Sequence, residues 1–411
     1  MSNNSRAVAK TLFGFEEILA EELEQLGAKN VSIGRRAVYF DANDEMVYRA
    51  NYFSRLCISI LIEVDSFTIR DEKDLYKKTL RIDWSAYFNV EKTFAVKGSV
   101  NSDMFRHSQY PNLVVKDAIC DAFREDTGKR PDVELRSPNI MIDLHINDNK
   151  VTISLNTSGT PLFQRGYRKE AGEAPINEVV AAGLIRLSEW DKKRPLYDLM
   201  CGSGTIPIEA AMLANDIPAG FARKEYAFMH LNDFNAELWD RVKDSGNSRP
   251  KKEVVTIIGS DVDGEMINIA RRNVKNLPLA RNCQFEVKDF NDWEPEDKDG
   301  LLILNPPYDE RLDIDNIDEF YEEIGDHFKQ NMVGCDCWMI SSNMEALKFV
   351  GLKPTRKIKV FNGSLECSFR KYNIYEGSKK AKYNQEPKDE KQLEKEEKRR
   401  LARERAKARE L

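Results

Sequence analysis

The chain has 411 residues, of which 41% are apolar, 32% charged and 9% aromatic. This length exceeds what one hydrophobic core usually supports, so at least two folded units are expected, and the composition excludes a disordered or collagen-like chain. No apolar run approaches the roughly 20 residues of a membrane-spanning helix, and the N-terminus lacks a secretory signal pattern. The sequence therefore predicts a cytoplasmic protein without a membrane span.

The formal net charge of −6 is unevenly distributed along the chain. Residues 378–411 contain 13 Lys and Arg against 8 Asp and Glu, whereas residues 1–377 contain 50 against 61. A basic tail can add sequence-independent affinity for a polyanion. The same pattern also occurs in a solvated helix or a flexible end with mixed charges, so both interpretations stay open.

The seven cysteines and four histidines show no metal-binding pattern. There is no C-x-x-C pair and no zinc spacing, so we expect no metal site. Scattered single cysteines are typical of reduced thiols that fill a protein core.

The first part of the chain alternates between helical and strand patterns. Apolar residues at helical spacing predict a helix over residues 6–26, followed by the strand-like VSIGRRAVYF. A helix around Asp44 to Leu56 then precedes the β-branched run CISILIEV, and a second cycle ends in a hairpin around Asn147 to Asn149. Short alternating units of this kind predict an α+β region.

The pattern changes after residues 158–175, which are rich in Gly and Pro and predict a linker. The apolar strand patterns PLYDLM, VVTIIGSD, CQFEVKDF, LLILNPPY and CDCWMISS alternate with helical ones, which predicts a parallel sheet covered on both faces. The late segments RKIKVFN and ECSFRKYNIY are close enough to pair as an antiparallel ribbon at the sheet edge. We therefore expect a doubly wound α/β domain.

Ligands of such sheets bind beyond the carboxyl ends of the strands. The first strand-end loop, DLMCGSGT, contains Gly202 and Gly204, which allow a ligand to approach the backbone. Pro207 replaces the third glycine of a dinucleotide loop, and Asp198 would repel a pyrophosphate but suit an ammonium group. The loop therefore favours the methionine part of S-adenosylmethionine, although a purely structural tight turn is the alternative.

Two further strand ends carry acidic residues. Asp261 can accept both ribose hydroxyls of a nucleoside, and Asp263 is the better candidate for capping the next helix. Asp289 can accept from an adenine amino group beside the ring of Phe290. Taken alone, Asp289 has no stronger signal than a surface aspartate.

The fourth strand-end loop is Asn305-Pro306-Pro307-Tyr308. The prolines stiffen the turn and donate no hydrogen bond, so the Asn305 side-chain oxygen and the Pro306 carbonyl can each accept an N–H of a base amino group. Tyr308 supplies a stacking surface for a flipped base. This loop predicts transfer to an exocyclic amine.

The ordered set DLMCGSGT, GSDVD, VKDF and NPPYDERL resembles class I methyltransferases that act on exocyclic amines. From about residue 7 to about 375, the chain is similar to the THUMP-containing ribosomal RNA guanine-N2 methyltransferases, in particular to the N-terminal half of the bifunctional enzyme. The resemblance is carried through FRHSQYPNLVVKDAICDAF, LNTSGTPLFQRGYR and APINEVVAAGLI. Asp309 departs from it, because the family usually has glycine after the tyrosine.

The resemblance implies an α/β class I methyltransferase domain with a seven-stranded sheet, preceded by a ferredoxin-like segment and a THUMP module. It divides the chain into a ferredoxin-like segment 1–44, a THUMP domain 45–157, a linker 158–175, a methyltransferase domain 176–377 and the basic tail 378–411. The implied cofactor is S-adenosylmethionine, and the implied substrate is a guanine N2 amine in large-subunit ribosomal RNA or its precursor. We expect one activity rather than two, because only the charged tail follows residue 377.

The implied roles fall on residues already singled out. The catalytic candidates are Asn305, Pro306, Pro307 and Tyr308; the cofactor candidates are Asp198, Cys201, Gly202, Gly204, Asp261, Asp289 and Phe290. Cys201 is a loop residue rather than a nucleophile, because no base is evident nearby. The RNA-contact candidates are Arg106, His107, Lys116, Arg165, Arg168 and Lys169, each of which can instead be a solvated polar residue.

Several alternatives remain at this stage. NPPY also serves adenine-N6 methylation, and a glutamine amide of a protein substrate is a further acceptor. A non-catalytic RNA-binding assembly factor would keep the fold without the reaction. The sequence leaves open the target nucleotide and the oligomeric state.

Overall fold

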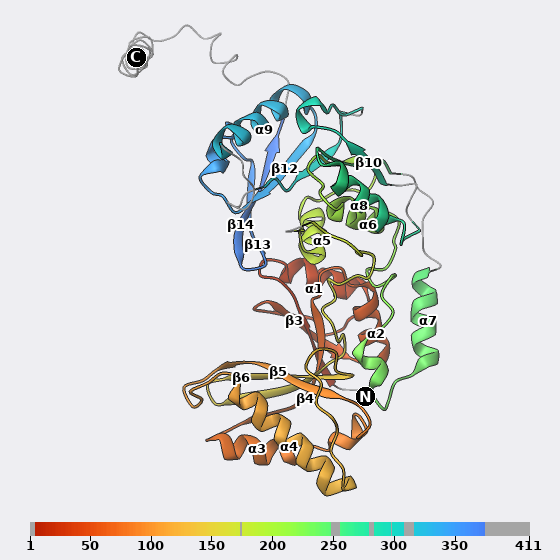
Figure 1. Ribbon diagram of the computed structural model, residues 1–411, viewed down its shortest axis with the longest axis vertical. Helices are drawn as coiled ribbons and strands as arrows, with labels where there is room; N and C mark the ends of the chain where they lie inside the picture. The colour runs from red at the N-terminus through yellow and green to blue at the C-terminus, as the bar shows by residue number, and fades with distance from the viewer. Residues whose placement is uncertain are drawn as a thin grey trace. The chain divides into compact units, whose positions relative to one another are not determined.

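The computed structural model describes residues 5–172, 175–247, 255–278, 283–296, 298–307 and 316–374. These residues form two seven-stranded sheets, one in each half of the chain (Figure 1). Within the described residues, no helix is long and apolar enough to cross a membrane. The basic tail 378–411 lies outside this part of the chain.

The N-terminal sheet has the strand order β2-β3-β1-β4-β7-β6-β5. Neighbouring strands pair antiparallel, except β5 and β6, which are parallel. Its strands are β1 Ser5–Lys10, β2 Ser32–Gly34, β3 Ala37–Ala42, β4 Ser59–Thr68, β5 Phe94–Asn101, β6 Ile140–Asn147 and β7 Lys150–Asn156. The predicted hairpin around Asn147 to Asn149 is confirmed as β6 and β7.

The described residues of this half form four α-helices. They are α1 Glu16–Gln25, α2 Asp44–Phe53, α3 Glu72–Leu80 and α4 Tyr110–Thr127, with the 3₁₀ turn η1 Trp84–Ala86. Helix α3, which was not predicted from the sequence, packs beside α4 (Figure 1). Helix α4 ends at Gly128, whose left-handed backbone forms the C-cap.

The predicted helix over residues 6–26 is wrong in its first part. Residues 5–10 form β1, a strand in the interior of the sheet that pairs with both β3 and β4. Ala7 and Ala9 are fully buried between these neighbours. Gly14, with φ +88°, turns the chain before α1 begins. The single strand predicted over VSIGRRAVYF is likewise a hairpin of β2 and β3.

The C-terminal sheet has the order β10-β9-β8-β11-β12-β14-β13. The first five of these strands are parallel, and β14 is antiparallel to both β12 and β13. Its strands are β8 Leu196–Asp198, β9 Ile257–Asp261, β10 Cys283–Val287, β11 Leu301–Leu304, β12 Asp336–Ser341, β13 Arg356–Asn362 and β14 Leu365–Asn373. The predicted doubly wound sheet and its antiparallel edge ribbon are confirmed.

The helices of this half are α5 Glu178–Leu187, α6 Thr205–Ala214, α7 Ala236–Asn247, α8 Gly264–Val274 and α9 Ile317–Asn331, with the 3₁₀ turns η2 Ala227–His230, η3 Phe290–Asp292 and η4 Ala346–Lys348. Helix α7, which the sequence analysis missed, packs against α2. There the ring of Trp239 meets those of Tyr48 and Tyr52 edge-on.

Close contacts join the two halves. The Phe15 ring lies against Gly183 of α5, where an added Cβ would come within 2.2 Å of the ring. The Arg55 guanidinium donates to the carbonyl oxygen of Met212, near the end of α6, at 3.1 Å, and to that of Ile217 in the turn after this helix. These contacts connect the N-terminal sheet to the helix that follows the glycine loop.

Candidate active site

Four loops meet at one edge of the C-terminal sheet. The parallel strands β10, β9, β8 and β11 are neighbours in this order, so their carboxyl ends point the same way. The loops after these strands hold Asp289, Asp261, Asp198 and Asn305 respectively. The structure therefore brings the four predicted strand-end loops to one edge, as expected of an α/β ligand site.

The loop after β8 is built around two glycines with left-handed backbones, Gly202 at φ +50° and Gly204 at φ +83°. Among the described residues, a Cβ added to Gly202 would meet nothing within 4 Å, so none of them fills the space beside this residue. At Gly204 an added Cβ would approach Ala270 and Phe285 to 2.9 Å. Gly204 therefore allows α6 to pack closely, whereas Gly202 faces open space.

Two carboxylates stand at this loop. Asp198 is 1% exposed, and burial raises the pKa of its carboxyl well above the usual value, with nearby Asp261 raising it further. Asp261 accepts hydrogen bonds from the Gly202 amide at 2.8 Å and from the Asp263 amide at 3.0 Å, which ties the loop to β9. A cation bound beside Asp198 would relieve the cost of its buried charge.

The predicted helix cap is confirmed. Asp263 is the N-cap of α8, and its carboxylate accepts from the Glu265 amide at 2.8 Å. Asp261 is therefore not needed for this cap.

The loop after β10 contains Asp289 and Phe290. The Asp289 carboxylate accepts from the Asn291 amide at 2.9 Å and caps η3. The Phe290 ring is buried edge-on against Phe320 and His327, with ring centroids 5.7 Å apart in each pair. Phe290 is thus held firmly beside Asp289.

Two apolar side chains at the same edge were missed by the sequence analysis. Val262, directly after Asp261, is 71% exposed, and Val287 at the end of β10 is 56% exposed. Exposed apolar side chains between polar ligand groups suit the flat ring of a base. The available signal was a valine one or two residues from each predicted ligand acid.

The Asn305 loop follows the fully buried strand β11. The Asn305 Oδ1 atom is buried and has no hydrogen-bond partner among the residues that the structure describes. The Pro307 carbonyl accepts from the Tyr321 hydroxyl at 3.5 Å, and that hydroxyl is 2.7 Å from the Ser341 Oγ. The turn is therefore anchored to α9 and β12, while none of the described residues pairs with the amide oxygen. Tyr308 and Asp309 lie outside the described residues.

All seven cysteines are buried, as predicted for core thiols. Burial raises the pKa of the Cys201 thiol well above its usual value, which keeps the thiol protonated. No group of three or more His, Cys, Asp or Glu side chains within the described ranges is arranged to hold a metal ion.

The RNA-contact candidates of the N-terminal half lie around the loop from β5 to α4. Arg106 and His107 are exposed in this loop, which precedes α4. Lys116, on α4, has a side chain that is 29% exposed and pairs with Asp117 at 2.7 Å. The exposed positions of Arg106 and His107 allow contact with a polyanion.

The RNA-contact candidates in the linker do not all lie on the surface. Arg165 is 1% exposed, pairs with the equally buried Glu209 at 3.4 Å, and donates to the Arg55 carbonyl at 2.5 Å. This burial contradicts the predicted RNA contact, because no part of the guanidinium reaches the surface. The sequence could not show that its partner lies 44 residues away on α6.

Arg168 is 16% exposed and is engaged with the cofactor loop region. It donates to the Thr205 hydroxyl at 2.6 Å and to the Ile176 carbonyl at 2.8 Å, and it pairs with Glu178 at 3.4 Å. Thr205 is the first residue of α6, directly after Gly204. Lys169 is exposed at the next position.

Residues 165–371 match the family described as an RMKL-like methyltransferase domain, which is half of the chain. The chain belongs to this family. Residues 70–156 match the THUMP domain, and residues 6–61 match the RlmL ferredoxin-like domain. The RMKL-like methyltransferase thus has the predicted ferredoxin-like, THUMP and class I methyltransferase architecture, while the boundary at residue 44 stays a prediction.

A curated relative is the Ribosomal RNA large subunit methyltransferase K/L of Shewanella frigidimarina (strain NCIMB 400). It is 36% identical over 371 residues, which cover 89% of this chain and 52% of that protein. The RMKL-like methyltransferase therefore spans about half the length of the curated relatives it matches.

Solved structures agree with this assignment. SMU.472, complexed with SAH, has a TM-score of 0.82 at 28% identity and covers 92% of this chain and 100% of its own. A protein from Listeria monocytogenes str. 4b F2365, named as a "predicted N6-adenine-specific DNA methylase", also has a TM-score of 0.82 at 28% identity and covers 90% of this chain and 96% of its own. This chain therefore belongs to the class I methyltransferases, whose cofactor is S-adenosylmethionine.

Proposed function

We propose that this protein transfers a methyl group from S-adenosylmethionine to the N2 amine of a guanine in 23S ribosomal RNA. The observation that carries the proposal is the buried Asn305 Oδ1, which lacks a partner among the described residues. A buried acceptor left unpaired costs free energy, and an amine N–H of a bound base would pair it. The position of Asn305 at the end of β11, next to β8, supports this role.

Asn305 and Pro306 would act by orienting the amine. The lone pair of an exocyclic amine is delocalised into the base, so the nitrogen is a poor nucleophile. Accepting one N–H at the Asn305 oxygen and the other at the Pro306 carbonyl favours the geometry in which the nitrogen can attack. Tyr308 is expected to stack on the flipped base and stays a prediction.

The cofactor supplies an electrophilic methyl group whose leaving group is a neutral thioether. Asp198 would hold its ammonium group, Asp261 its ribose hydroxyls and Asp289 its adenine amino group. The open space at Gly202 and the exposed Val262 support this placement. A covalent intermediate on Cys201 is not needed, because the nitrogen attacks the methyl group directly.

RNA is the proposed substrate because a THUMP domain precedes the methyltransferase domain. The Shewanella relative is named as a methyltransferase of large-subunit ribosomal RNA. Arg106 and His107 are proposed to contact phosphates, because both are exposed on that domain.

The first test is Asn305→Ala with protein-free 23S RNA. Loss of an orienting acceptor should lower kcat by about 10²–10³-fold. The affinity for S-adenosylmethionine, measured by calorimetry, should stay within about twofold of that of the unchanged protein. Asn149→Ala, in the exposed β6–β7 turn, is the matched control and should retain full turnover.

Mass spectrometry of the RNA nucleosides identifies the product. N2-methylguanosine is expected. N6-methyladenosine instead would establish the adenine alternative, which the name of the Listeria structure favours. Full turnover by Asn305→Ala would rule out the amine-orienting role.

A further inference from the structure

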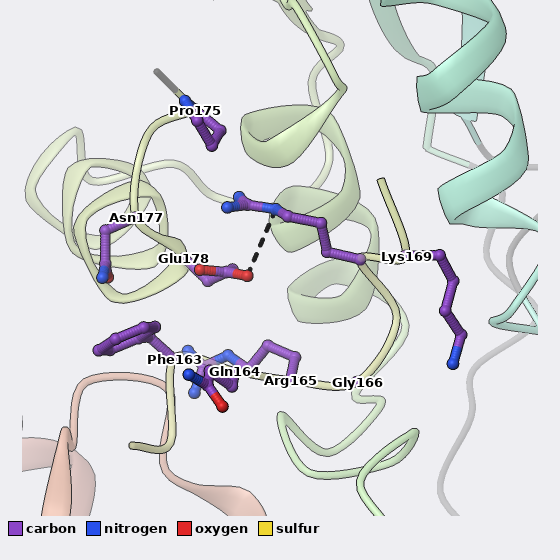
Figure 2. Close-up of a pocket in the computed structure, with 9 residues that line it drawn as sticks. Phe163, Gln164, Arg165, Gly166, Lys169, Pro175, Asn177 and Glu178 are labelled. Atoms are coloured by element: carbon purple, nitrogen blue, oxygen red, sulfur yellow. Dashed lines mark ion pairs between the residues drawn. The ribbon is translucent and has the colours of Figure 1, made fainter. Parts of the chain in front are cut away.

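Side chains behind the strand-end loops hold these loops in place. At the start of α5, Glu178 forms an ion pair with Arg168 at 3.4 Å (Figure 2), and Arg168 also donates to the hydroxyl of the first residue of α6. The hollow beside this ion pair therefore belongs to the glycine loop. The Asn305 loop is held by a different pair of side chains, Tyr321 of α9 and Ser341 at the end of β12.

The Asn305 loop has few ways to be held through its own backbone. Pro306 and Pro307 have no N–H, so neither can donate a backbone hydrogen bond, and their rings fix only the φ angles. The ψ angle of Pro307 stays rotatable and sets the direction in which its carbonyl points. A donor that reaches this carbonyl from another element therefore limits the conformations of the loop.

Two buried hydroxyls supply such a donor. Tyr321 and Ser341 are both fully buried, and their hydroxyl oxygens lie 2.7 Å apart. The Tyr321 hydroxyl lies 3.5 Å from the Pro307 carbonyl oxygen, and the Ser341 Oγ accepts from the Asn343 amide at 3.0 Å. Because β11 and β12 are parallel neighbours, these groups meet at the edge of the sheet where the Asn305 loop begins.

Only one arrangement of the hydrogens makes all three contacts at once. The Asn343 amide can only donate, so the Ser341 Oγ accepts from it and donates its own hydrogen to the Tyr321 oxygen. The Tyr321 hydrogen then points at the Pro307 carbonyl. The reverse order, in which Tyr321 donates to Ser341, would take this donor away from the carbonyl. We call the series Asn343, Ser341, Tyr321 and Pro307 the hydrogen-bond relay.

We propose that Tyr321 and Ser341 are positioning residues for methyl transfer, because their hydroxyls hold the Pro307 carbonyl and, through it, the Asn305 loop. This inference rests on the proposed function, in which the loop orients the acceptor amine. The Tyr321 to Pro307 contact of 3.5 Å is long for an O–H···O hydrogen bond, which is usually about 2.7–2.8 Å. Long contacts in ligand-free active sites tighten when the reacting groups are bound, so the relay should contribute to kcat rather than to substrate affinity.

Tyr321→Phe tests the hydroxyl separately from the ring. The Tyr321 ring lies edge-on to that of Phe320, with centroids 6.2 Å apart, and Phe320 meets Phe290 at 5.7 Å. Phenylalanine at position 321 retains this aromatic packing and removes only the hydroxyl. The Kd for S-adenosylmethionine should therefore stay within about twofold, because the hydroxyl and the proposed cofactor contacts share no partner.

The test compares Tyr321→Phe and Ser341→Ala with the unchanged full chain, using protein-free 23S RNA and saturating S-adenosylmethionine. Each single variant should lower kcat by about tenfold and leave the KM for RNA unchanged, because a misplaced loop slows the reaction of bound substrate. The double variant should lose no more activity than the weaker single variant, since both substitutions break the same relay. A merely structural role would lower the melting temperature and leave kcat of the folded protein unchanged.

Tyr52→Phe and Ser188→Ala are the matched controls. Each removes a buried hydroxyl whose hydrogen bond lies outside the strand-end loops: Tyr52 donates to the Asn247 side chain at 3.0 Å, and Ser188 donates to the Ile185 carbonyl at 2.7 Å. Both variants should retain full kcat.

Three results would overturn the inference. Full kcat in either folded variant, from an unchanged chain that methylates RNA, removes that hydroxyl from the relay and leaves the proposed function standing. A loss of about 100-fold in the double variant, the product of two separate effects, shows that the two hydroxyls act independently. If the unchanged chain does not methylate RNA, the proposed function and the positioning role both fail. Should Tyr321→Phe not fold, Ser341→Ala decides alone.

Discussion

At the scale of single residues, some buried polar side chains have hydrogen-bond or charge partners in the structure, and others have none among the described residues. Asn305 Oδ1 is buried without a partner within the described part of the chain, and the Asp198 carboxyl is buried beside a second carboxylate. Arg165 is equally buried, but it is fully engaged by Glu209 and by backbone carbonyls. Burial therefore marks a ligand group only when the hydrogen-bond partner is missing or the charge is uncompensated.

Asp198 leads to a pH prediction for cofactor binding. Its pKa is raised in the cofactor-free protein, and a bound ammonium group would lower it again, so binding releases a proton. The affinity for S-adenosylmethionine should therefore rise with pH, by at most tenfold per unit, and level off above the raised pKa. Calorimetry from pH 5 to pH 8 measures this slope.

Asp198→Asn should bind S-adenosylmethionine more weakly and lose that pH slope. Asp103→Asn, at an exposed site in the THUMP domain, should keep both the affinity and the slope. A slope that persists in Asp198→Asn would assign the proton to another group.

At the scale of elements, α6 is held along its length. Its first residue, Thr205, accepts from Arg168, and the Met212 carbonyl in its last turn accepts from Arg55, which also bonds the Ile217 carbonyl after the helix. Between them, Glu209 accepts from Arg165 at 3.4 Å and from the Tyr167 hydroxyl at 3.1 Å. The linker and the N-terminal half thus fix the helix that carries the glycine loop.

The buried pair of Arg165 and Glu209 should be important for stability. Arg165→Met leaves the Glu209 charge buried and uncompensated, so the free energy of unfolding should fall by about 3–5 kcal/mol. The double variant Arg165→Met/Glu209→Leu removes both charges and should recover part of this loss. Urea unfolding measures both effects.

Lys243→Ala is the control, because it breaks the exposed pair with Asp240. Its effect should stay below about 1 kcal/mol. If Arg165→Met is as mild as this control, the buried pair contributes little to the fold.

At the scale of the whole molecule, an acidic chain is proposed to bind RNA. Residues 1–377 contain more acidic than basic side chains, so attraction must come from local groups rather than from the total charge. The exposed loop with Arg106 and His107 is such a group within the described residues. The basic tail 378–411 lies outside them, and its contribution stays a prediction.

Salt dependence tests this RNA contact. Arg106→Ala should weaken binding of the full chain to a 23S RNA fragment and reduce the slope of log K against log salt concentration by about 1, because one phosphate contact is lost. Lys29→Ala, at an exposed site on the ferredoxin-like domain, should leave both values unchanged. An unchanged slope in Arg106→Ala would remove Arg106 from the interface.

Local chemistry explains why much of the site was predictable. A buried strand such as β11, a glycine loop such as Gly202 to Gly204 and an N-cap such as Asp263 are each encoded within a few neighbouring residues. Since parallel strands place their carboxyl ends at one edge, the order of these motifs also predicted that their loops would meet. Family, fold class and cofactor followed from this local information.

Other features depended on distant partners and could only be seen in the folded chain. Residues 5–10 form a strand because β3 and β4 pair with them, although their apolar content also continues a helical pattern. Arg165 is buried because Glu209 and Arg55 converge on it from other segments. The sequence by itself determined the motifs and their order, whereas the tertiary structure decided which charges are buried and which polar atoms lack a partner, because burial and pairing depend on residues far apart in the chain.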